Sequence, residues 1–268
     1  MFLAGLLLKI VMTAGIVVAA SIVVERSGPF IGALIASLPT AGGAALIILA
    51  FEHPPAFIAA SVIGSMVSVA ISAVFALTYA ALARRHSLVT SLAGAFVVWF
   101  VPVFLSRLVP WTALSATLLT VVIFPTTIYL GSRFREEGKA KGKVQLTHRD
   151  LVWRAGVVTV CVIVVTAAST AIGPYFSGVF AFFPIAMSSF FIILHSRIGG
   201  QAAGSVAAHL PAPLIGLAPG FLAVHYLAVP LGVWWSYLIG LSLCIGWNAM
   251  LWLLRQRRLT AGGRAPAP

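Results

Sequence analysis

The residues of this chain that could do chemistry are small polar groups, glycines and prolines set inside long apolar runs. They form three groups along the chain: Ser37, Pro39, Thr40, Gly42 and Gly43; Pro184, Ser188 and Ser189; Ser205 and His209. Hydroxyl groups, together with backbone N–H groups at a helix amino end, can bind a solute, and an imidazole can exchange a proton near neutral pH. We therefore interpret these ten positions as a candidate substrate-binding set.

The first two groups occupy matching places in a repeated unit. Residues 28–49 and 173–194 each read Gly-Pro-aromatic, eight residues, Pro, seven residues, Ile-Ile-Leu, at a constant offset of 145. Each copy is long enough to cross a bilayer, yet each has a proline at its centre. Interrupted segments at corresponding positions of two halves typify a transporter's binding site. The alternative is a simple proline kink whose backbone groups are satisfied by neighbouring helices.

His209 is the most informative ionisable residue. Counted from a helix start near Gly199, it is expected about 15 Å deep, near the middle of the bilayer. An ionisable group at that depth is costly and suggests proton coupling. The alternative is a neutral histidine that bonds a carbonyl freed by nearby prolines.

A second hydroxyl pattern lies on residues 56–83. Ser61, Ser65, Ser68 and Ser72 are spaced by 4, 3 and 4, which places them on one helix face. Such a face either packs closely against another helix or lines a polar pathway.

Composition indicates a polytopic membrane protein. The 268 residues are 61% hydrophobic and 8% charged, with a mean hydropathy of +1.08. The net charge of +12 sits in short gaps between apolar runs, which argues against nucleic-acid binding. The chain contains no HExxH, CxxC, GxSxG, GxGxxG or P-loop pattern, so we expect no enzyme, cofactor or metal site. An intramembrane, lipid-modifying enzyme is a third and least favoured alternative.

The predicted fold is an all-α membrane protein with about nine transmembrane helices. The expected helices span 3–24, 29–50, 56–83, 88–108, 111–131, 151–172, 175–195, 199–227 and 231–254. They divide the chain into a first repeat (1–110), a linking helix (111–131), a basic loop (132–149), a second repeat (150–254) and a disordered tail (255–268). Because one helix separates two four-helix repeats, the repeats are expected to be inverted.

Positive charge sets the orientation. With nine helices, 15 of the 17 Lys and Arg residues fall on one side, and basic residues in short loops mark the cytoplasmic side. We expect an inner (plasma) membrane protein with a periplasmic amino end and a cytoplasmic carboxyl end. In this topology the half-helices that follow Pro39 and Pro184 present their amino ends to one central region, which favours an anionic group.

The leading prediction is a secondary transporter or flippase-like permease for a small, anionic or amphipathic substrate. Its partners are the lipid bilayer and a small-molecule or lipid-like substrate, and an oligomer is compatible with the sequence. The alternative is a non-transporting membrane scaffold or assembly factor. A central cavity reached by water favours the first, and a dry packed centre the second.

The segments around Leu38-Pro39-Thr40 and Phe183-Pro184-Ile185 resemble the small GlpM-type bacterial inner-membrane proteins, whose pattern is an apolar run with a central Phe-Pro-Thr followed by His-Tyr. About 25 residues in each half are covered. Leu replaces Phe in the first copy, Ile replaces Thr in the second, and His-Tyr is missing from both. The resemblance implies an internally duplicated form of such a protein and adds little about activity.

Overall fold

The computed structural model describes residues 11, 15, 40–135 and 147–261. All regular elements in these residues are helices, which confirms the all-α class. Five helical stretches are long and apolar enough to cross a bilayer. The expected helix 3–24, apart from two isolated residues, and the first part of 29–50 lie outside the described residues, so the count of nine stays a prediction.

The described helices follow the expected ranges closely between residues 55 and 131, whereas the expected helix 199–227 is divided among three helices. They are α3 (Thr40–Glu52), α4 (Pro55–Leu82), α5 (Leu88–Ser106), α6 (Ala113–Gly131), the 3-10 helix η1 (Ser132–Phe134), α7 (His148–Ala181), α8 (Ile185–His209), α9 (Pro211–Leu214), α10 (Leu217–Leu227) and α11 (Val233–Ala261). Their starts have local causes. Pro54 precedes α4, the Ser87 hydroxyl accepts from the N–H of Thr90, and Thr112 forms a capping box with Ser115.

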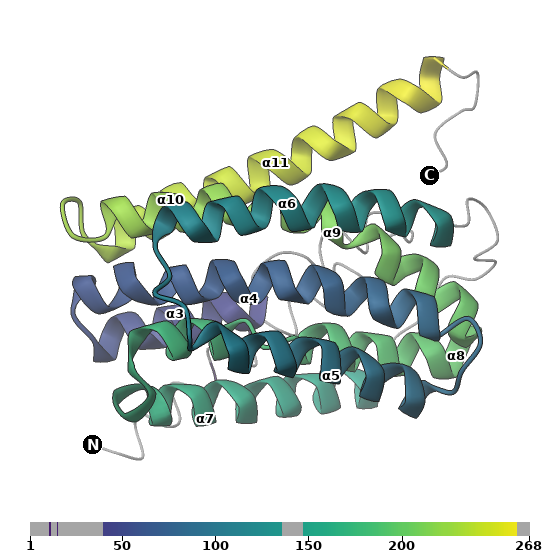
Figure 1. Ribbon diagram of the computed structural model, residues 1–268, viewed down its shortest axis with the longest axis horizontal. Coiled ribbons are helices and arrows are strands. Elements are labelled where there is room, and N and C mark those ends of the chain that lie inside the picture. Colours follow the sequence, from purple (N-terminus) through teal and green to yellow (C-terminus); the bar gives the residue numbers. More distant parts are fainter. Residues whose placement is uncertain (1–10, 12–14, 16–39, 136–146, 262–268) are drawn as a thin grey trace.

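The core is built around α4. This helix is largely buried and packs against α5, α6, α7, α8 and α10, whereas α11 contacts mainly α10 and its far half leaves the bundle (Figure 1). At 28 residues, α4 is about 42 Å long, enough to cross a bilayer.

Two glycines interrupt the helices of the second half. Gly173 (φ 74°) breaks α7 and Gly199 (φ 81°) breaks α8, both in a conformation that L-residues with a Cβ rarely adopt. These positions agree with the expected end of one helix at 172 and the expected start of another at 199. Residues 174–198 therefore form one segment between two glycine turns.

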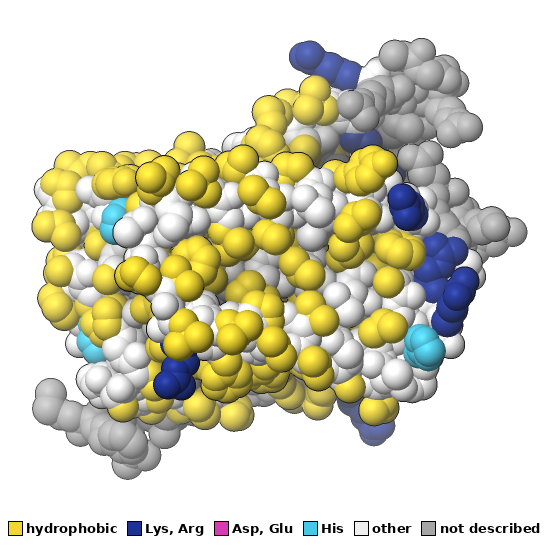
Figure 2. All heavy atoms as spheres, viewed as in Figure 1, with side chains coloured by type: hydrophobic (Ala, Val, Ile, Leu, Met, Phe, Trp, Pro, Cys, Tyr) yellow, Lys and Arg dark blue, Asp and Glu magenta, His cyan; other side chains and the backbone are white. Residues whose placement is uncertain are grey.

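The surface suits a lipid environment. Large apolar side chains such as Val101, Phe104 and Leu118 are exposed on α5 and α6, and hydrophobic side chains cover the face that these helices form (Figure 2). Basic side chains gather at the end of the molecule that holds the α4–α5 turn (Figure 2). There Arg84 donates to the carbonyl of Arg133, and Arg197 forms an ion pair with Asp150. We call this end the basic end.

Candidate functional site

The segment 174–198 is interrupted at its centre by residues 182–184. Helix α7 ends at Ala181 and α8 begins at Ile185, with Pro184 at the N-cap of α8. The Ser68 hydroxyl donates to the carbonyl of Phe182 at 3.1 Å. Because Ser68 is the middle residue of α4, this break lies midway along the helix that crosses the bundle. The central position of the Pro184 interruption is thus as the sequence predicts.

Two phenylalanines pack the break in different directions. Phe183 contacts the rings of Phe96, Trp99 and Phe100 on α5, with centroid distances of 5.7, 5.0 and 5.8 Å. Phe182 contacts the Phe221 ring on α10 at 4.8 Å. These aromatic contacts hold a non-helical segment in place inside the bundle.

The amino end of α3 meets this break. Helix α3 begins at Thr40, and a Cβ added at Gly42 would lie 2.5 Å from the Phe182 ring. Ile185 and Ala186, in the first turn of α8, are partly buried and pack against the buried cluster that contains Ala41 and Ala45. The amino ends of α3 and α8 therefore lie beside the same interruption. Ser37 and Pro39 lie outside the described residues.

Ser188 and Ser189 are buried at the amino end of α8, and their hydroxyls bond to backbone carbonyls nearby in the chain. The Ser188 hydroxyl donates to the carbonyl of Pro184 at 2.7 Å, and that of Ser189 to Ala186 at 2.9 Å. Pro184 leaves no N–H at its position, and the serine hydroxyl adds a second bond to the carbonyl that already accepts from the N–H of Ser188.

The serine face of α4 packs closely against residues 174–182. Ser65 donates to the carbonyl of Gly178 at 3.1 Å, and a Cβ at Gly178 would collide with the carbonyl of Ser61. Ser72 accepts from the indole N–H of Trp99 at 3.2 Å. Of the two interpretations of this face, close packing is confirmed.

Ser205 and His209 lie away from the break, toward the basic end. Gly204 approaches the carbonyl of Ala80, which is 12 residues, or about 18 Å, beyond Ser68 on α4. Beside His209, the carbonyl of Ala208 accepts from Arg135 at 3.1 Å, just past the end of α6. The expected central depth of His209 is corrected accordingly, because residues after Gly199 pack at the end of α4 and not at its middle. Its Nδ1 bonds the carbonyl of Ser205 at 2.8 Å.

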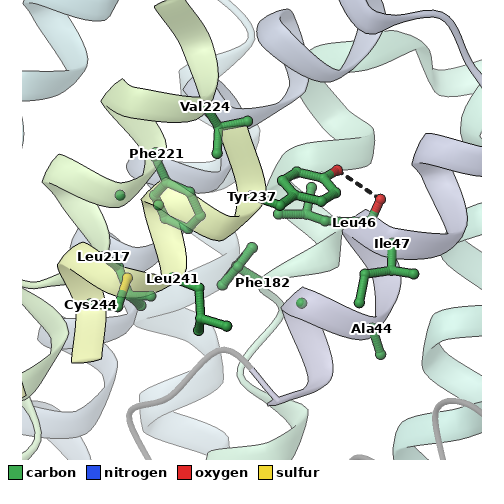
Figure 3. Close-up of a pocket in the computed structure, with 13 residues that line it drawn as sticks. Ala44, Leu46, Ile47, Phe182, Leu217, Phe221, Val224, Tyr237, Leu241 and Cys244 are labelled. Atoms are coloured by element: carbon green, nitrogen blue, oxygen red, sulfur yellow. Dashed lines mark hydrogen bonds between the residues drawn. The ribbon is translucent and has the colours of Figure 1, made fainter. Parts of the chain in front are cut away.

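An apolar cavity of about 330 Å³ flanks the other side of α3. It lies between α3, α10 and α11, with Phe182 in its wall (Figure 3). Gly43 lines it, and the Tyr237 hydroxyl donates to the carbonyl of Leu46 at 2.8 Å (Figure 3). Only Gly43 of the predicted set lines this cavity, so the cavity is not the polar one that the sequence predicts.

Arg154 is a functional candidate that is not among the ten positions predicted from the sequence. Its side chain is 7% exposed, and among the described residues neither Nε nor Nη1 has a hydrogen-bond partner. Its guanidinium carbon lies 5.4 Å from the centre of the Phe190 ring. Such a contact contributes about 0.5–2 kcal/mol, whereas burial of an unpaired charge costs several kcal/mol. Burial depends on the packing of helices that are distant in the sequence. The sequence alone could show only that a basic residue lies near the start of the apolar run 151–172.

The described residues contain no group of three or more His, Cys, Asp or Glu that could hold a metal ion. No protein-family model, curated protein or solved structure matches the chain. The interpretation of function therefore depends on the geometry of the break, α3 and Arg154.

Proposed function

We propose that this protein is a membrane permease, a secondary transporter or flippase, whose substrate binds where α3 meets the break between α7 and α8. The observation that carries this proposal is the packing of the amino end of α3 against Phe182, midway along α4. Broken helices that present their amino ends at mid-membrane are a recurrent way to bind anionic substrate groups.

The proposed architecture is the inverted repeat of the sequence analysis. In it, α3 and the first part of α8 (185–198) are equivalent half-helices that follow Pro39 and Pro184. The shared position of their amino ends at one interruption supports this pairing. The apolar cavity beside α3 suits an apolar part of an amphipathic substrate, since ligand cavities are mostly apolar with a few polar groups.

The alternative function, a scaffold or assembly factor, is favoured by the dense packing of the centre. Ser65 and Ser68 are fully buried and bond to backbone carbonyls, and the aromatic rings around Phe183 fill the space beside α5. In a scaffold the break would only allow close helix packing. The permease requires in addition that α3 or α8 move to open the centre.

A transport assay with matched proline variants tests the proposal. Purified protein is first screened for compounds that raise its thermal unfolding midpoint, and the strongest hits are followed in proteoliposomes by counterflow. We expect Pro184→Ala to lower counterflow at least about tenfold, because a continuous helix removes the free amino end from the centre. Pro110→Ala, in the connection between α5 and α6, should leave counterflow unchanged. If both variants give equal counterflow, or if none of the compounds is transported into the proteoliposomes, the permease proposal is wrong.

A further inference from the structure

Arg154 is buried beside the start of α3, as the register of the helices shows. The imidazole of His53, directly after α3, bonds Ser169 of α7 at 2.7 Å. Twelve residues separate Ala41 from His53, and the same number separate Val157 from Ser169. Because α3 and α7 run in parallel, Ala41 is level with Val157, three residues or roughly 4.5 Å beyond Arg154.

The Arg154 guanidinium lies over the Phe190 ring of α8, inside the bundle. Arg154 is four residues, about 6 Å, beyond Asp150 along α7, and the ion pair of Asp150 with Arg197 joins α7 to α8 at the basic end. Phe190 is five residues, about 7.5 Å, beyond Ile185, the first residue of α8. The guanidinium therefore lies between the basic end and the break.

Asp150 is close enough to attract Arg154 electrostatically but, within the described residues, accepts no hydrogen bond from it. Asp150 accepts from the N–H and hydroxyl of Thr147 and from Arg197. Within the described residues, the Arg154 guanidinium thus has its aromatic contact, and no carboxylate bonds to it. A buried guanidinium without hydrogen-bond acceptors lowers the stability of the fold unless a ligand supplies those acceptors.

We propose that Arg154, together with the amino end of α3, binds an oxyanion: a carboxylate or phosphate group. A guanidinium fits such groups with two parallel hydrogen bonds, and the first N–H groups of a helix add a favourable dipole. The anion comes from a soluble substrate or from a lipid headgroup. This inference names the substrate group of the permease and so rests on that proposed function.

Anion-dependent thermal unfolding of the full chain tests this site without a transport assay. The protein is held in phosphatidylcholine nanodiscs, and sodium phosphate or sodium acetate is compared with sodium chloride at equal ionic strength. A second set of nanodiscs contains phosphatidylglycerol. A midpoint raised by phosphate or acetate supports a soluble anion, and one raised only by phosphatidylglycerol supports a headgroup. No shift in any arm overturns the proposal.

Arg154→Gln should weaken the anion effect about tenfold or more, since it removes charge-assisted hydrogen bonds. Arg154→Lys keeps the charge but loses the paired geometry and should bind with intermediate affinity. The control is Arg133→Gln, an exposed arginine at the basic end, which should respond as the wild type does. An equal anion shift in Arg154→Gln and wild type would contradict the site.

Stability without added anion separates ligand binding from a structural role. If Arg154 binds a ligand and has no structural role, Arg154→Gln should unfold at the same temperature as the wild type or higher. The substitution removes a buried charge that has no hydrogen-bonded partner. A midpoint several degrees lower in both Arg154→Gln and Arg154→Lys shows that the arginine serves packing, and the proposal fails.

Counterflow distinguishes failure of this site from failure of the permease proposal. If counterflow proceeds normally in Arg154→Gln, the permease proposal stands and the anion site does not. If the anion binds but nothing is transported, the anion site stands and the permease proposal does not.

Discussion

At the scale of single residues, the centre of this protein is organised by bonds from side-chain hydroxyls to backbone carbonyls. Ser68 satisfies the carbonyl of Phe182, and Ser188 bonds that of Pro184. In lipid, an exposed backbone carbonyl is costly, so a proline interruption requires such donors. The hydroxyls therefore stabilise the break inside the bundle, whether or not it binds a ligand.

Ser68→Ala should destabilise the protein by about 1 kcal/mol, because the Phe182 carbonyl loses a buried donor. The measurement is the thermal unfolding midpoint in detergent or nanodiscs. Ser242→Ala is the matched control, since the Ser242 hydroxyl is exposed and bonds the Leu238 carbonyl of its own helix. Equal midpoints for the two variants would show that Ser68 does not support the break.

At the scale of elements, the close approach of α4 to residues 174–182 fixes where the break lies. Gly64 and Gly178 let the two backbones touch, since a Cβ at Gly64 would collide with the carbonyl of Tyr175 and one at Gly178 with that of Ser61. Small residues at such contacts allow packing that larger ones would prevent.

Gly178→Ala should therefore lower stability by about 1–3 kcal/mol, as expected when a buried contact is overpacked. Gly156→Ala on α7 is the control, because an added Cβ there meets nothing within 4 Å. Replacement of a helical glycine by alanine in open space should be neutral or stabilising. The comparison uses unfolding midpoints at matched lipid composition, and a Gly178→Ala variant as stable as Gly156→Ala would contradict the close contact.

The helix ranges were predictable because apolar runs bounded by glycine, proline and charge are local signals. The expected span 56–83 becomes α4 at Pro55–Leu82, and the Gly-Pro pair at 173–174 is the turn that breaks α7. The location of Pro184 at the middle of the bundle was also predictable, because Pro184 lies at the centre of an apolar run, 173–194, that is long enough to cross a bilayer. What could not be predicted is which side chains meet there, because Phe182 and Phe183 read as ordinary apolar residues, and the burial of Arg154 depends on distant helices.

The position of His209 shows the same limit. Counting residues along a helix assumes that the helix follows the membrane normal. The turn at Gly199 sends the following residues along the end of α4, so ten residues of helix do not reach the centre.

At the scale of the whole molecule, an apolar bundle carries its charge asymmetrically. Arg84, Arg133, Asp150 and Arg197 interact at the basic end, while the long exposed faces of α5 and α6 are apolar. This distribution is compatible with a multi-pass membrane protein. From the positive-inside tendency we predict that its basic end lies in the cytoplasm.

Reporter fusions test this orientation. Fusions after Arg85, within 133–149, after Arg197 and at the carboxyl end should all give cytoplasmic signals, because the nine-helix topology places these positions on the side that holds 15 of the 17 Lys and Arg residues. A fusion after Arg107 should report the periplasm. A periplasmic signal from 133–149 would contradict both the nine-helix topology and the inverted repeat.

The central claim, that the break is a substrate site and not only a packing device, is tested most directly by thiol labelling at the centre. A variant with Cys161 and Cys244 replaced by alanine receives a single cysteine at Ala186, in the first turn of α8. A membrane-impermeant maleimide is applied to oriented vesicles. The permease account predicts labelling of Ala186→Cys, slowed by a bound substrate, and none of Ala70→Cys, which is fully buried in α4. Absence of labelling at Ala186→Cys from both sides of the membrane would contradict it and favour the scaffold.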